Sequence, residues 1–229
     1  MKITTINTIE VSSMCDNSCV YCPAPKQHEH RKTGFITRHD FEKAIALVQE
    51  LCRRGTQREL NLFGVGEPTL HPDIVALVKH ARQSLPKGQH IHLNTNGNRM
   101  TPGLAEMLRD AGISQIDVTV HENHEAAART IRIFRILGIE HNVSIDPVVY
   151  PNNWAGQVDW FEPDKRFYNP GPCPWLNRGQ AMVMSDGNIT TCCIDAFAKN
   201  VFSNVSDADV WEKDVKISAL CKTCHHSVN

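Results

Sequence analysis

The chain has 229 residues, of which 41% are hydrophobic and 21% are charged, and its formal net charge is −1. This composition predicts a folded core, and the lack of a dominant basic stretch argues against a nucleic-acid partner. We find no apolar region typical of a signal peptide and no apolar run of membrane-spanning length, so we expect a cytoplasmic protein with no membrane partner. In that reducing compartment, the nine cysteines are expected to serve metal binding or redox chemistry.

Predicted strands and helices alternate through the first part of the chain. The strands are predicted at residues 5–13, 58–64, 90–97, 115–120 and 142–149. Helices follow the first four strands: three begin near Thr37, Asp73 and Thr101, and the fourth ends near Leu137. This alternation predicts a parallel sheet covered by helices, with the functional loops at the carboxyl ends of the strands.

The composition changes after about Val149. Residues 150–175 are rich in Pro, Gly and Asn, which predicts a linker or a long loop over the mouth of the first domain. Residues 181–193 predict a hairpin with Asp186 and Gly187 at its turn. We therefore expect one domain at residues 1–150, and a linker with a small cysteine-containing module at residues 151–229.

Three cysteines lie close together directly after the first predicted strand. Residues 15–22 read CDNSCVYC and contain Cys15, Cys19 and Cys22. Three thiolates can bind three irons of a four-iron, four-sulfur (4Fe-4S) cluster and leave the fourth iron open to a substrate or cofactor. A structural zinc site is the alternative, but zinc requires four ligands and this loop offers three.

This CxxxCxxC spacing resembles the signature of the radical S-adenosylmethionine (SAM) superfamily, and GVGEP at residues 64–68 is similar to its GGEP-like motif. The resemblance implies an α/β fold, a partial (βα)5–6 TIM-like barrel, and the predicted alternation agrees with it. It also implies that the open iron binds SAM, whose cleavage gives a 5′-deoxyadenosyl radical that abstracts a hydrogen atom from the substrate. A reductant such as flavodoxin or ferredoxin is the implied partner.

The same resemblance implies which residues contact SAM. Gly66, Glu67 and Pro68 match the motif, whereas Val65 replaces its first glycine. The other candidates lie in the cysteine loop and at the strand ends: Tyr21, Asn94, Asn96, Thr119 and His121. The alternatives are an ordinary turn for GEP, an ordinary turn for residues 94–97, and a surface position for His121.

Four C-terminal cysteines resemble the ligands of a twitch module, the shortened relative of the SPASM domain: Cys173, Cys192, Cys221 and Cys224. Four thiolates would complete a second 4Fe-4S cluster without an open iron, which favours electron transfer. Cys193 is the alternative to Cys192, or a hydrogen donor, although neighbouring strand residues face opposite ways. A structural zinc ribbon is the alternative for the whole module.

Among enzymes with a twitch module, the chain most resembles the inosamine dehydrogenases, which oxidise a cyclitol alcohol to a ketone. Trp154 stands where those enzymes have an arginine that faces the substrate, so we expect a different substrate. We expect a small hydroxylated metabolite to be oxidised, with the second cluster as electron acceptor. Modification of a peptide and redox-neutral epimerisation stay open, and no catalytic side chain is assigned.

Overall fold

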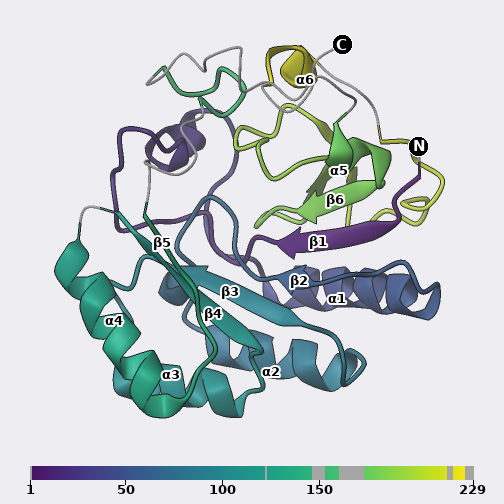
Figure 1. The fold of residues 1–229 in the computed structure, drawn as a ribbon. Coiled ribbons are helices and arrows are strands. Elements are labelled where there is room, and N and C mark those ends of the chain that lie inside the picture. The colour runs from purple at the N-terminus through teal and green to yellow at the C-terminus, as the bar shows by residue number, and fades with distance from the viewer. Residues whose placement is uncertain (1, 122, 146–152, 160–172, 216–218, 225–229) are drawn as a thin grey trace.

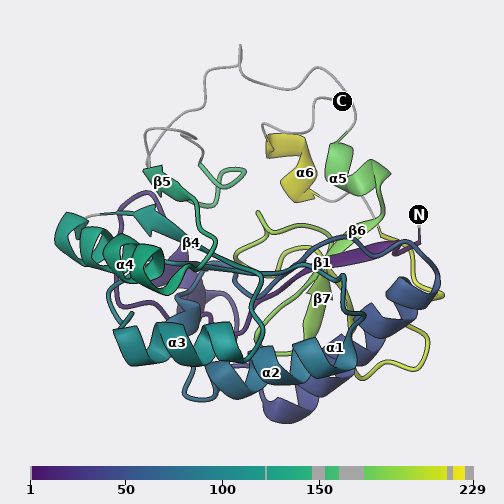
Figure 2. The same ribbon diagram turned by 60° about the horizontal axis from the view of Figure 1, so that its bottom comes forward.

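The computed structural model describes residues 2–121, 123–145, 153–159, 173–215 and 219–224. Their strands form one eight-stranded sheet in the order β5-β4-β3-β2-β1-β6-β7-β8. Figures 1 and 2 show the long helices packed against one face of this sheet. The molecule is therefore a mixed α/β protein whose sheet is mostly parallel.

Five parallel strands form the half of the sheet that comes first in the sequence. They are β1 (Thr5–Ile9), β2 (Leu60–Asn61), β3 (Ile91–Thr95), β4 (Gln115–Val120) and β5 (Val143–Ile145). Each lies within a predicted strand, so the predicted order and the parallel arrangement are confirmed. The end of the fifth predicted strand, residues 146–149, lies outside the described residues.

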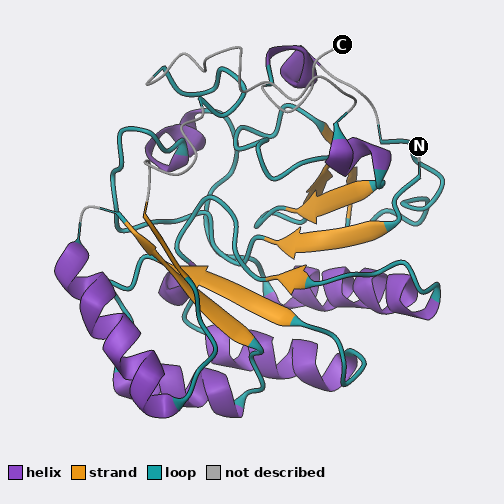
Figure 3. Ribbon diagram, in the orientation of Figure 1, coloured by secondary structure: helices purple, strands orange, loops and turns teal. Residues whose placement is uncertain are grey.

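Four helices connect these strands and cover the sheet (Figure 3). They are α1 (Arg38–Arg53), α2 (Ile74–Ser84), α3 (Pro102–Asp110) and α4 (His124–Leu137). Thr37 and Thr101 cap α1 and α3 as predicted, because their side chains accept the backbone N–H of Asp40 and Leu104. Each such cap contributes about 1 kcal/mol. Within the described residues, no helix combines the length and apolar character that a membrane crossing needs.

The predicted hairpin is confirmed, and it joins the sheet of the first half. β6 (Gln180–Val183) pairs in parallel with β1, and β7 (Asn188–Thr190) and β8 (Val201–Asn204) continue the sheet in antiparallel fashion. Two short helices, α5 (Pro174–Asn177) and α6 (Ala219–Thr223), flank it. Most of the predicted linker lies outside the described residues, and the domain division near residue 150 stays a prediction.

The two faces of the parallel half differ in chemistry. Ile91, Leu93, Ile116 and Val118 are fully buried in the core that the sheet forms with the helices. The residues between them, which point to the other face, are polar. The core therefore lies on the helical side, and the opposite face stays available for a site.

Candidate active site

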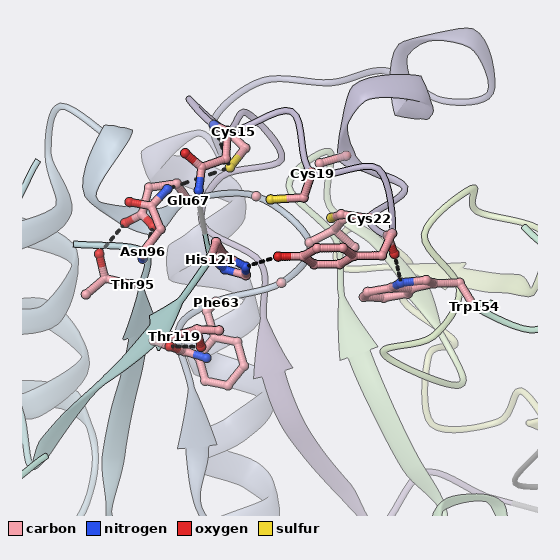
Figure 4. A pocket seen from close by; sticks show the side chains of 17 residues that line it. Cys15, Cys19, Cys22, Phe63, Glu67, Thr95, Asn96, Thr119, His121 and Trp154 are labelled. Atoms are coloured by element: carbon pink, nitrogen blue, oxygen red, sulfur yellow. Dashed lines mark hydrogen bonds between the residues drawn. The ribbon is translucent and has the colours of Figure 1, made fainter. Parts of the chain in front are cut away.

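A cavity lies at the carboxyl ends of strands β1 to β4, where parallel-sheet enzymes place their chemistry (Figure 4). Its lining includes all three cysteines of the N-terminal loop, Cys15, Cys19 and Cys22. It also includes all the predicted cofactor residues but one: Tyr21, Gly66, Glu67, Asn94, Asn96, Thr119 and His121. The exception is Pro68, which is buried and begins the 3-10 helix η2 (Pro68–Leu70).

The cysteine loop presents its three thiols at one end of this cavity, as Figure 4 shows. Burial raises the pKa of the Cys15 thiol, while the backbone N–H of Asn17 donates to Cys15 Sγ at 3.4 Å and favours the thiolate. The side-chain amide of Asn96 lies 3.9 Å from the same sulfur. Three thiols without a fourth cysteine in the lining fit a 4Fe-4S cluster that keeps one iron open.

Asp16 anchors the cysteine loop, and sequence reasoning missed it. Its carboxylate accepts a hydrogen bond from Asn96 Nδ2 at 2.8 Å and pairs with Arg99 Nε at 3.1 Å. Burial raises the pKa of Asp16, but these donors and Asn98 outweigh it and hold that pKa below its usual range. A charged Asp16 thus ties the cysteines to the segment after β3.

Position 66 requires glycine because the backbone of residues 12–14 passes very close to it. A Cβ atom there would lie 2.4 Å from the carbonyl oxygen of Ser12 and 2.6 Å from that of Met14. The neighbouring Val65, the one departure from the family motif, packs against Ala196 and Phe197 of the C-terminal segment. The departure therefore creates a contact between the two halves of the chain.

The carboxylate of Glu67 is buried and already holds four hydrogen bonds from the protein. Oε1 accepts the backbone N–H and hydroxyl of Thr69, at 3.0 and 2.6 Å, and the Thr95 hydroxyl at 2.8 Å. Within the described part of the chain, Oε2 accepts one hydrogen bond, from the Asn96 N–H at 2.7 Å. Burial raises the pKa of Glu67 despite these donors. Oε2 is therefore the atom with acceptor capacity left for the ammonium group of SAM.

Tyr21, His121 and Trp154 form a connected wall of the cavity. The Tyr21 hydroxyl lies 2.9 Å from His121 Nδ1, and the Trp154 indole N–H donates to the Tyr21 carbonyl at 3.0 Å. Trp154 and Ala155 have φ angles of 53° and 57°, in the left-handed region that few residues other than glycine adopt. His121 is thus part of the cavity wall, which argues against the simple surface position.

A second cavity collects the C-terminal cysteines. Cys173, Cys192, Cys221 and Cys224 all line it, and the rest of its wall is largely apolar. Cys193 is absent from that lining, which favours Cys192 as the ligand. Among the described residues, no three His, Cys, Asp or Glu side chains are close enough to hold a single metal ion. A four-iron cluster instead places each thiolate on a different iron.

Comparison with known proteins identifies the family. Residues 9–149 match the model of the Radical SAM superfamily, and the chain belongs to this superfamily. The sequence resemblance in the cysteine loop and the GEP turn is thereby confirmed. Membership implies SAM and one 4Fe-4S cluster as cofactors, and the three-cysteine cavity fits that pair.

The individual relatives include two different kinds of enzyme. The S-adenosyl-L-methionine-dependent 2-deoxy-scyllo-inosamine dehydrogenase of Niallia circulans is 23% identical and aligns over 98% of this chain and 94% of its own length. The GTP 3′,8-cyclase of Pseudomonas fluorescens (strain Pf0-1) is 33% identical over 112 residues, which cover 49% of this chain. The chain spans only 32% of that cyclase. The likeness to the dehydrogenase is lower in identity but extends over the whole length.

A solved structure confirms the fold. The crystal structure of BtrN in complex with AdoMet and 2-DOIA superimposes with a TM-score of 0.72 at 20% identity, over 93% of this chain and 84% of that one. The predicted partial barrel of the radical SAM fold is therefore confirmed.

Proposed function

We propose that this radical SAM enzyme oxidises a small hydroxylated molecule and passes one electron of the reaction to a second 4Fe-4S cluster. The observation that carries the proposal is the pair of cysteine-lined cavities, one with three cysteines and one with four. Three thiols leave an iron open for SAM, whereas four thiols complete a cluster suited to electron transfer. When bound, the first cluster supplies the electron that cleaves SAM, and a low-potential flavodoxin or ferredoxin is the expected donor.

Residues of this chain position the reactants. Oε2 of Glu67 and the Asn96 side chain lie beside the three cysteines, where the methionine part of SAM is expected. Tyr21, His121 and Trp154 form a hydrogen-bonded wall of the same cavity, and we assign to this wall the exclusion of water that a reactive radical requires.

The reaction balances as a two-electron oxidation of an alcohol. Bound SAM would supply the group that takes a hydrogen atom from the carbinol carbon. The substrate would then lose the hydroxyl proton to solvent or a base and one electron to a cluster held by the C-terminal cysteines Cys173, Cys192, Cys221 and Cys224, which would leave a carbonyl.

Packed protein joins the two cavities and supports this electron transfer. Trp154 packs against one apolar cluster that Cys22 also packs against, and against a second cluster that contains Cys224 and that Cys192 also packs against. Gln157 holds the turn of Trp154 in place, because its Nε2 donates to the carbonyls of Trp154 and Ile194, both at 2.7 Å. Trp154 thus packs against both the apolar cluster beside Cys22 and the apolar cluster that contains Cys224.

The decisive experiment removes two ligands of the second cluster. The double variant Cys221→Ala/Cys224→Ala should still cleave SAM to 5′-deoxyadenosine but form little oxidised product, since only the second half-reaction needs the acceptor. Cys193→Ala, beside the cavity, is the matched control and should keep product formation.

Circular dichroism must first show that the double variant is folded, because metal binding contributes to the stability of such modules. A folded double variant with full product formation would contradict the acceptor role. It would indicate a redox-neutral reaction such as epimerisation.

A further inference from the structure

The N-terminal cysteine loop is accessible from a second side. Cys15, Asn17 and Ala24 line the active-site cavity, and the same three residues line a separate cavity of about 250 Å³, here called the outer hollow. The rest of the outer hollow comes from the segment 13–18, from the 3-10 helix η1 (Ala24–Glu29) and from the turn after it. None of the predicted cofactor residues lines the outer hollow. The loop can therefore be reached from a side that the expected SAM site does not use.

Apolar side chains are exposed on the cysteine loop and beside it. Val20 and Met14 are 67% and 44% exposed, and Phe35, 42% exposed, pairs with Ser12 just before the loop. These three are among eight large hydrophobic side chains that are exposed in the described part of the chain. Exposed apolar side chains that are scattered singly are ordinary, but a group at one place indicates an interaction surface.

The segment after the loop adds positive charge at the outer hollow. Lys26 on η1 and Lys32 in the turn after it are exposed, and neither forms an ion pair with another described residue. Arg31 does not add to this exposed charge, because it is buried in a pair with Glu10. Glu29 is the one acidic residue in the segment 23–35.

The C-terminal half contributes a third lysine beside η1. The rings of His30 and Phe197 are stacked with their centroids 4.0 Å apart, and Lys199 Nζ lies 5.7 Å from the centroid of the same Phe197 ring. Lys199 is exposed and likewise forms no ion pair within the described residues. Three lysines and one glutamate give this region a net charge of +2, whereas the whole chain has a net charge of −1.

This combination matches the composition of a protein–protein interface. Such interfaces have an apolar centre within a polar rim. The positive charge favours an acidic partner, because complementary charges speed the encounter and fix the orientation of the two proteins. Interfaces for electron transfer are small, so a patch of this size is sufficient for a transient complex. Once SAM and substrate fill the active-site cavity, an electron for the N-terminal cluster must enter from another side, and the outer hollow offers that route.

We propose that the outer hollow, with Lys26, Lys32 and Lys199 around it, is the docking surface for an acidic one-electron carrier protein. This inference rests on the proposed function, which requires an electron donor, and it states where that donor binds. The carrier loses one electron and the N-terminal cluster gains it, with no bond made or broken. Of the three cysteines in the loop, Cys15 is the one that lines the outer hollow, so it is the ligand that faces the carrier.

The first test measures docking without turnover. Oxidised flavodoxin is titrated into the reconstituted protein, and isothermal titration calorimetry gives the dissociation constant at low and at high salt. We expect binding that weakens as the salt concentration rises. The double variant Lys26→Glu/Lys32→Glu should weaken binding about tenfold. The control Lys79→Glu/Lys87→Glu makes the same change in net charge at exposed lysines on α2 and in the turn after it, and should have a much smaller effect.

The second test separates docking from chemistry. SAM cleavage to 5′-deoxyadenosine is driven either by reduced flavodoxin or by dithionite, a small reductant that needs no docking surface. Lys26→Glu/Lys32→Glu should slow the flavodoxin-driven reaction about tenfold and leave the dithionite-driven rate unchanged. Val20→Ser should also weaken flavodoxin binding, because it removes an apolar contact, and should retain the iron content of the wild type.

The outcomes distinguish this inference from the proposed function. No binding of flavodoxin to the wild type, equal losses in the lysine variant and its control, or unchanged binding in Val20→Ser would overturn the docking surface. Loss of dithionite-driven cleavage in the lysine variant would also overturn it, since the lysines would then act on the cluster itself. If flavodoxin binding depends on Lys26 and Lys32 as expected but neither reductant gives SAM cleavage, the docking surface stands and the proposed reaction fails.

Discussion

Arg31 and Glu10 form a buried ion pair beneath the cysteine loop. Two nitrogens of the Arg31 guanidinium contact the two carboxylate oxygens of Glu10 at 2.7 and 2.8 Å, and the side chains are 2% and 0% exposed. Glu10 also accepts the backbone N–H groups of Val65 and Ser185, and Arg31 Nε donates to the Ala196 carbonyl at 2.8 Å. One pair thus joins the end of β1, the GEP loop and the C-terminal segment.

Replacing Arg31 should strongly destabilise the fold. Arg31→Met leaves the Glu10 carboxylate buried without its counter-ion, which costs about 3–5 kcal/mol. Guanidinium chloride denaturation of the reconstituted protein measures this loss in the free energy of unfolding. Arg38→Met is the control, because the pair of Arg38 and Glu42 is exposed and should contribute very little. Equal effects of the two variants would contradict the role of the buried pair.

Gly66 and Gly103 should respond to alanine with opposite signs. Gly66→Ala forces a Cβ against backbone atoms, so we expect a loss of about 1–3 kcal/mol and weaker SAM binding. Gly103 lies in α3 with nothing within 4 Å of its added Cβ, so Gly103→Ala should stabilise by about 0.5–1 kcal/mol. Thermal denaturation compares the two, and a neutral Gly66→Ala would refute the close approach.

Glu67 is expected to bind SAM through Oε2. Glu67→Gln keeps the size of the side chain but replaces an acceptor with an amide, so SAM affinity should fall about tenfold to a hundredfold. Thr69→Val removes one hydrogen bond to Oε1, the carboxylate oxygen that is not expected to contact SAM. This variant should therefore affect SAM binding much less. Isothermal titration calorimetry with SAM measures both. If SAM binds Glu67→Gln as tightly as wild type, Glu67 does not contact the cofactor.

The number of irons should divide between the two cysteine groups. We expect about eight irons per chain after anaerobic reconstitution, as two 4Fe-4S clusters require. The triple alanine variant at Cys15, Cys19 and Cys22 should retain about half of them. Iron and sulfide analysis measures this directly. Full iron content in the triple variant would remove the N-terminal loop as a cluster site, and zinc in place of iron at the C-terminal cysteines would favour the zinc ribbon.

Cys192 and Cys193 should differ in their effect on the second cluster. Cys192 lines the cavity with three other cysteines, whereas Cys193 does not, so only Cys192→Ala should lower the iron content of that site. Mössbauer or electron paramagnetic resonance spectra of each variant report the remaining clusters. Loss of the second cluster in Cys193→Ala alone would reverse the assignment.

The sequence by itself determined the family, the order of the strands and helices, and the three-cysteine loop. These features depend on local patterns: the CxxxCxxC spacing, the caps at Thr37 and Thr101, and apolar residues at helical spacing. The same patterns placed nearly all the cofactor candidates at strand ends. In a parallel sheet such residues meet at one edge, so the candidates line one cavity.

Only the tertiary structure decided which polar groups of distant segments pair with one another. The parallel pairing of β6 with β1 brings the C-terminal hairpin beside the first strand across about 175 residues of sequence, and no local pattern encodes such a contact. The sequence gives no sign that Arg31 neutralises Glu10, or that both carboxylate oxygens of Glu67 accept hydrogen bonds from the protein. Each of these depends on which buried groups approach within hydrogen-bond distance, and long-range packing sets that distance.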